Sequence, residues 1–308
     1  MFQSGYINLY KTGTLYERIE QAQRLLKECQ ICPRKCKVNR FQNKFGVCKV
    51  GRLPKVSSYN PHFGEESPLV GTHGSGTIFI TSCNLGCVFC QNYDISHLGE
   101  GYEVSLERFA QIMIELQNMG CHNINFVTPT HVVPQILEAL PRAIKDGLKI
   151  PLVYNTGGYD LVETLRLLEG AFDIYMPDFK FFDSDVSARL CKASDYPEVA
   201  MRAIKEMHRQ VGDLVVDDCG VAERGLIVRH LIMPNGLAGT RRVMKFLAQE
   251  ISSNTYVNIM DQYRPCDLAH KYPEINRRIS TEEFETALRI AQEEGIHRLD
   301  SETSFYLR

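Results

Sequence analysis

Three cysteines, Cys83, Cys87 and Cys90, stand close together in the segment SCNLGCVFCQN. Three thiolates in so short a segment can wrap one side of a metal centre and leave one coordination position open, as catalytic metal sites do. On a four-iron cluster, the same three ligands would leave one iron free to bind a further group. A closed structural site would want a fourth ligand nearby, and none follows here. A zinc site with a distant fourth ligand and a set of buried free thiols are the alternatives.

A second group of cysteines lies nearer the start of the chain and comprises Cys29, Cys32, Cys36 and Cys48. Its spacing, C-x2-C-x3-C-x11-C, fits a closed tetrahedral site. The spacing does not match that of the bacterial ferredoxins. A structural zinc ion, a second iron–sulfur cluster and thiols without metal all remain open. The other four cysteines are scattered along the chain.

The elements that must position these cysteines alternate between short apolar runs and longer helical patterns. We predict strands at 77–82, 123–127, 151–155, 172–176, 225–233 and 256–260. Their nearly continuous apolar character is typical of a parallel sheet that is covered on both faces. The segments between them predict helices at 105–119, 131–145, 160–169, 184–210, 237–251 and 280–294, the last opening with a capping box at Ser280 and Glu283.

Six β–α units predict an α/β fold, either a partial barrel or a doubly wound sheet. In both architectures the active site lies at the carboxyl ends of the strands, and Cys83 follows the first strand directly. We divide the chain into a basic N-terminal segment with a four-cysteine metal site, residues 1–60, and an α/β domain, residues 61–308.

The composition is that of an ordinary globular protein, with 44% hydrophobic and 23% charged residues in a chain of 308. It argues against disorder and against a fibrous repeat. The first residues lack a basic start followed by an apolar run, and no stretch approaches the roughly 18 apolar residues of a membrane span. We therefore expect a cytoplasmic protein without a membrane partner. Clustered cysteines in such a protein are more often metal ligands or redox groups than disulfides.

The cysteine run, with Phe89 before its third cysteine, resembles the signature of the radical S-adenosylmethionine enzymes. The resemblance implies that Cys83, Cys87 and Cys90 hold a [4Fe–4S] cluster whose fourth iron binds S-adenosylmethionine. One electron from the cluster then yields a 5′-deoxyadenosyl radical. Residues 62–96 are similar to homologues of pyruvate formate-lyase activating enzyme that carry an extra N-terminal cysteine cluster. This resemblance implies a partial (β/α)6 barrel.

The resemblance also suggests residues that contact S-adenosylmethionine. Thr128 and Thr130 stand where the superfamily usually has a Gly-Gly-Glu-like turn, although this sequence lacks both the glycines and the acid. Thr130 could equally cap the next helix. Asn155 precedes a pair of glycines that let backbone approach a nucleoside closely, with a plain turn as the alternative.

Two later strand ends carry charged residues. Asp178 and Lys180 resemble an Asp-x-Lys pair that contacts S-adenosylmethionine in activating enzymes, and a solvated ion pair is the alternative. Arg229 stands in an otherwise apolar strand, where a buried arginine needs an anionic partner. The carboxylate of S-adenosylmethionine would serve.

The expected activity is hydrogen abstraction from an unidentified substrate, which the resemblance suggests is a glycine of a glycyl-radical protein. Another protein, an RNA or a small molecule is the alternative substrate. A non-catalytic zinc or other metal-binding protein is the competing class.

The basic N-terminal segment suggests a docking partner. Residues 1–60 carry 12 Lys and Arg against 3 Asp and Glu, whereas the remainder carries 23 against 34. Because the superfamily needs an external reductant, we expect Lys35, Lys37 and Arg40 to help dock an acidic flavodoxin- or ferredoxin-type donor. A nucleic-acid partner is disfavoured because no aromatic residues are interleaved for stacking.

Overall fold

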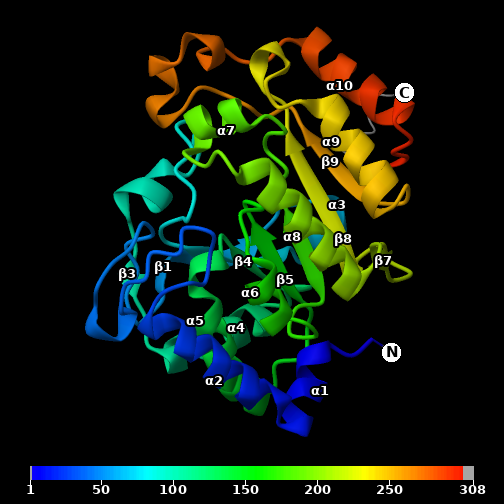
Figure 1. Ribbon diagram of the computed structural model, residues 1–308. Coiled ribbons are helices and arrows are strands. Elements are labelled where there is room, and N and C mark those ends of the chain that lie inside the picture. Colours follow the sequence, from blue (N-terminus) through cyan, green and yellow to red (C-terminus); the bar gives the residue numbers. More distant parts are fainter. Residues whose placement is uncertain (1, 301–308) are drawn as a thin grey trace.

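The computed structural model describes residues 2–300 and contains one continuous mixed sheet in the order β10-β9-β8-β6-β5-β4-β2-β1-β3. Six neighbouring strands run parallel in chain order (Figure 1). They are β2 (Ser75–Ile80), β4 (Ile124–Val127), β5 (Leu152–Thr156), β6 (Ile174–Pro177), β8 (Ala222–Leu231) and β9 (Tyr256–Met260). All six predicted strands are therefore confirmed, and the fold is an α/β partial barrel.

Four further strands flank this parallel set and were not predicted. β1 (Lys55–His62) pairs antiparallel with β2, and β3 (Tyr102–Glu103) pairs with β1. β10 (Arg298–Leu299) extends the opposite edge, and β7 (Val215–Val216) lies beside β8. Within residues 2–300 the two edges of the sheet do not pair with each other, so the barrel is open there. β1 also crosses the predicted domain boundary at residue 60.

Helices follow the parallel strands as the sequence predicts. They are α4 (Leu106–Asn118), α5 (Val133–Lys145), α6 (Val162–Leu167), α7 (Ser184–Cys191), α8 (Tyr196–Val211), α9 (Thr240–Phe246) and α10 (Thr281–Glu293). The predicted capping box at Ser280 and Glu283 opens α10. The segment 184–210 divides into two helices because Lys192 adopts a left-handed conformation and Pro197 fits only a first helical turn.

The N-terminal residues wrap around the outside of the barrel. α1 (Gly5–Thr12) and α2 (Thr14–Lys27), blue in Figure 1, lie alongside α5. An irregular segment with one 3-10 turn, η1 (Arg40–Gln42), then leads to β1, and α3 (Ser67–Val70) precedes β2. The remaining short turns are η2 (Asp94–Leu98), η3 (Thr130–Val132), η4 (Pro234–Gly236), η5 (Leu247–Ile251), η6 (Asp267–Lys271) and η7 (Pro273–Ile275).

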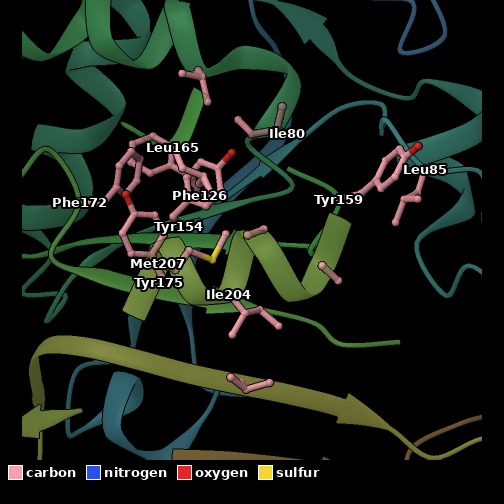
Figure 2. Close-up of a cluster of buried hydrophobic side chains, with 14 of the residues drawn as sticks. Ile80, Leu85, Phe126, Tyr154, Tyr159, Leu165, Phe172, Tyr175, Ile204 and Met207 are labelled. Atoms are coloured by element: carbon pink, nitrogen blue, oxygen red, sulfur yellow. The ribbon is translucent and has the colours of Figure 1, made fainter. Parts of the chain in front are cut away.

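A cluster of aromatic rings fixes the middle strands against the helices (Figure 2). Tyr154 of β5 packs edge-to-face on Phe172 and Tyr175, with ring centroids 5.1 and 5.7 Å apart. Such pairs add specific geometry to the burial of large apolar surfaces. Because side chains alternate along a strand, Asn155 next to Tyr154 points to the opposite face, into the barrel. Within residues 2–300, no helix is long and apolar enough to cross a membrane.

Candidate active site

A cavity of about 220 Å³ lies at the carboxyl ends of the parallel strands. The loop after β2 contributes thiols to it, and the next strands contribute polar and charged groups. Its chemically active lining residues are Cys83, Cys87, Cys90, Thr128, Asn155, Thr156, Asp178, Lys180, Arg229 and Gln262. The fold thus brings together every predicted cofactor-binding residue of the barrel except Thr130.

The three thiols are held by a loop that is fixed on several sides. The Leu85 N–H lies 3.3 Å from Cys83 Sγ, and Cys90 Sγ lies 3.1 Å from Ser96 Oγ. Burial raises the pKa of Cys83 to about 12. The free thiols therefore stay protonated at neutral pH, and a metal would have to displace the protons as it binds. Hydrogen bonds to sulfur are what iron–sulfur sites use to adjust their potential, so this donor set fits a cluster.

Backbone strain accompanies two of the strand ends that face the cavity. Ser82, directly before Cys83, has a φ of 77°, and Thr128, directly after β4, has a φ of 62°. Non-glycine residues in this region cost about 1–3 kcal/mol each and persist where the surrounding structure enforces them. Hydrogen bonds from the Ser82 N–H to Ile95 O and from the Thr128 N–H to Asn155 O supply that enforcement.

A network of ions around the buried Asp178 carboxylate lines the same cavity as the thiols. Asp178 accepts from Lys180 Nζ at 2.5 Å and from Arg229 Nε at 2.7 Å. Burial alone would raise the pKa of Asp178, but the two cations outweigh it and hold that pKa below its ordinary value. Arg229 Nη2 also donates to Asn155 Oδ1 at 2.8 Å. The pair at 178 and 180 is therefore buried rather than a solvated ion pair.

Glu66 is a member of this network that sequence reasoning missed. It is buried, and its Oε1 lies 3.8 Å from Arg229 Nη1 and 3.1 Å from Asn258 Nδ2. Burial raises its pKa to about 7 although Arg229 opposes the shift. The only signal in the sequence was an acidic pair before a short apolar stretch. Nothing in that pattern indicates that the residue before α3 lies beside Arg229 and Asn258.

Thr130 lies outside the cavity. Its hydroxyl donates to Asp160 Oδ1 at 2.8 Å and contacts Thr156 Oγ1 at 3.1 Å, which places it in a buried network behind Thr156. It does not cap α5, whose N-cap residue is Val132, so that alternative is wrong. Contact between Thr130 and a bound ligand stays a prediction.

The four N-terminal cysteines converge on a second, much smaller void, which Arg34, Arg40 and Asn84 also line. Asn84 follows Cys83 directly, so the two cysteine groups meet at this residue. Across the described residues, no set of three or more His, Cys, Asp or Glu side chains is gathered closely enough to hold a single ion as it stands. Arg40 exposes only 1% of its surface, so the expectation that it helps form a basic docking surface is wrong.

Comparisons with known proteins relate part of the chain to a described superfamily and nearly all of it to one relative. A sequence model described as the radical SAM superfamily matches residues 77–219. The protein MJ0674 of Methanocaldococcus jannaschii, described as uncharacterized, is 35% identical over 304 residues, which cover 94% of this chain and 82% of that protein.

Two solved structures show weaker similarity. The crystal structure of HydG, a maturase of the [FeFe]-hydrogenase, has a TM-score of 0.49 and 13% identity, covering 71% of this chain and 49% of that chain. Native anSMEcpe with bound AdoMet has a TM-score of 0.45 and 12% identity, covering 69% and 57%. The chain thus spans about half the length of both proteins.

Proposed function

Because residues 77–219 match the radical SAM superfamily, we propose that this chain cleaves S-adenosylmethionine reductively and abstracts a hydrogen atom from a substrate through the resulting 5′-deoxyadenosyl radical. The observation that carries this proposal is the convergence of Cys83, Cys87 and Cys90 with buried ions in one cavity. When bound, a [4Fe–4S] cluster supplies the electron for the cleavage.

The chain's own residues bind and orient the reactants. The three cysteines hold the cluster, and the Leu85 N–H stabilises the Cys83 sulfur. Lys180 and Arg229 are fixed by Asp178, so that their positive charge faces the cavity without side-chain rearrangement. We assign them to the carboxylate of S-adenosylmethionine. Preorganised charges of this kind cost no reorganisation when the ligand arrives.

Polar groups on neighbouring strands complete the binding site. Asn155 is held by Arg229 and presents its amide to the nucleoside. Thr128 offers a hydroxyl from a strained strand end for the amino group. The apolar residues Val127, Leu231 and Met260 line the remaining wall and limit water near the reacting atoms.

Anaerobic reconstitution of the full chain tests this activity. We expect about four irons at the Cys83 set and the formation of 5′-deoxyadenosine when S-adenosylmethionine and a reductant are added. Cys87→Ala should lose the iron of this set and the formation of 5′-deoxyadenosine. Cys219→Ala, which alters an exposed cysteine, should keep both. Wild-type protein that binds iron but releases no 5′-deoxyadenosine would contradict the proposal.

For the substrate, we favour a glycine of a glycyl-radical protein. The rim of the cavity favours a polypeptide as the substrate. Gln91 and Asn92 line the cavity, and the exposed side chains of Tyr93 and Leu98 follow them in the chain. A candidate protein labelled with deuterium at glycine should transfer deuterium into 5′-deoxyadenosine. Transfer from a small molecule or an RNA instead would exclude the activase role.

One protein partner and a second metal centre complete the proposal. An acidic flavodoxin- or ferredoxin-type protein delivers the electron, and the four N-terminal cysteines hold a second metal centre, either zinc or a second iron–sulfur cluster.

A further inference from the structure

A buried guanidinium without an anionic partner lies beside the four N-terminal cysteines. Arg40 donates through Nε to Gly51 O at 3.0 Å and through Nη1 to His131 O at 2.7 Å. Its Nη2 is buried and has no hydrogen-bond partner. Among residues 2–300, no carboxylate forms an ion pair with Arg40. Burying an unpaired charge costs several kcal/mol, so this position requires an anion.

The void beside Arg40 is lined by thiols. Cys29, Cys32, Cys36 and Cys48 all face it, together with the guanidinium itself. As neutral thiols they offer Arg40 no charge. As thiolates around Zn²⁺, or around a [4Fe–4S]²⁺ core, they would form a centre of net charge −2, which supplies the missing anion.

The backbone around these cysteines is built to approach sulfur. Lys35, Lys37 and Lys49 adopt left-handed conformations with φ of 39°, 55° and 55°, and each directly adjoins Cys36 or Cys48. A Cβ at Gly46 would lie 2.7 Å from Cys36 Sγ, so only glycine fits there. The neighbouring Val47 N–H lies 3.4 Å from the same sulfur. Strain of this kind clusters at ligand clamps.

We propose that Cys29, Cys32, Cys36 and Cys48 bind a metal centre as four thiolates and that Arg40 is its internal counter-cation. Binding draws the sulfurs toward the void and releases their four thiol protons, and no electron is transferred. This deepens the second-centre part of the proposed function by assigning the charge of that centre and the residue that balances it. It stands or falls separately from catalysis, because the Cys83 set can be removed first.

The test uses the full chain with Cys83, Cys87 and Cys90 replaced by alanine, purified without oxygen. Metal and acid-labile sulfide are then measured per chain. About one zinc without sulfide identifies a zinc site, and about four irons with sulfide identify a cluster. Either result supports the centre, and a chain with neither metal overturns it. Cys36→Ser should lose the metal and Cys219→Ser should keep it, and equal contents in the two would also overturn it.

A second pair of variants tests Arg40. Arg40→Met should weaken metal retention about 10-fold or more in competition with a chelator, as loss of a supporting contact does elsewhere. Arg52→Met is the matched control, since Arg52 lies nearby but is paired with Glu138. Equal retention in the two variants would exclude the counter-cation role. Should Cys36→Ser fail to fold, alkylation of the four thiols before and after chelation shows whether metal is bound, because bound metal must protect them.

Discussion

At the scale of single residues, Cys191 lies against Cys87, one of the three thiols of the cavity. Its sulfur is 3.1 Å from Cys87 Sγ, and Cys191 is fully buried at the end of α7. A hydrogen bond from the Val88 N–H to Leu190 O at 2.9 Å fixes α7 against the cysteine loop. The two thiols therefore need only approach by about 1 Å to form a disulfide.

We predict that peroxide joins Cys87 to Cys191 when no cluster is bound. Each thiol loses one proton and one electron, the peroxide is reduced to water, and Cys87 is lost as a ligand. Peroxide-treated wild-type chain should then take up iron only after reduction with a dithiol, whereas Cys191→Ala should need no reduction. Peptide mass spectrometry identifies the bond. A similar requirement for dithiol in Cys191→Ala would refute this prediction.

Asp178 is buried and balances two largely covered cations, so its removal should be costly. Asp178→Asn leaves Lys180 and Arg229 without their shared carboxylate, so we expect a loss of about 3–5 kcal/mol in the free energy of unfolding. The affinity for S-adenosylmethionine, measured by equilibrium dialysis, should fall as well. Glu250→Gln breaks an exposed pair with Lys205 and should cost less than about 1 kcal/mol. Similar losses in both variants would exclude the central role of Asp178.

His230 makes stability depend on pH. Burial lowers its pKa to about 4, and its two ring nitrogens contact Phe179 O and Thr240 Oγ1. The unfolded chain therefore binds the proton more tightly, and this contribution is complete above about pH 6.5 and is lost as the pH falls toward 4. Urea unfolding should show His230→Gln losing less stability than wild type over this range, by roughly 2–3 kcal/mol. Parallel pH profiles would contradict the assignment.

At the scale of elements, the parallel strands were predictable from the sequence, whereas β1 and the position of Glu66 were not. β4, β5 and β6 are nearly continuous apolar runs, because both of their faces are covered, and their ends locate Thr128, Asn155 and Asp178. β1 is polar on one face and contains Pro61, so its pattern resembles a loop. The position of Glu66 depends on the way α3 packs, a long-range contact that no local spacing records.

The N-terminal segment also supports the loop that carries Cys83. Arg34, between Cys32 and Cys36, donates to Asn84 O at 2.8 Å and to Lys192 O at 2.6 Å. Its guanidinium lies 5.2 Å from the centre of the Tyr159 ring. The four-cysteine segment is therefore fastened to the loop that carries Cys83.

Arg34→Met should consequently weaken cluster retention at the Cys83 set by about 10-fold or more, the cost of losing a supporting contact at a metal site. Iron release to a chelator measures it. Arg24→Met, on the exposed face of α2, is the control. Equal release rates in the two variants would show that the fastening does not matter to the cluster.

Across the full chain, the formal charge of −2 is the sum of a basic N-terminal segment and an acidic barrel. Lys35, Lys37, Lys44 and Lys49 are exposed in the four-cysteine segment, and so are Phe41 and Phe45. Charged side chains around exposed aromatic rings suit a transient partner that is steered electrostatically. Because this segment contacts the Cys83 loop through Arg34, a donor that docks here would lie near the cluster that we propose for that loop.

We therefore expect Lys35→Glu, Lys37→Glu and Lys44→Glu together to slow reduction of the Cys83 cluster by an acidic flavodoxin about 10-fold or more at low ionic strength. The difference should shrink as salt screens the charges. Reduction by dithionite, which needs no protein docking, should stay unchanged, and so should the rate in a control with Lys145→Glu and Lys149→Glu, on and just beyond α5. A uniform slowing with both reductants would mean that the substitutions damage the cluster rather than the docking surface, and unchanged rates would place the donor elsewhere on the molecule.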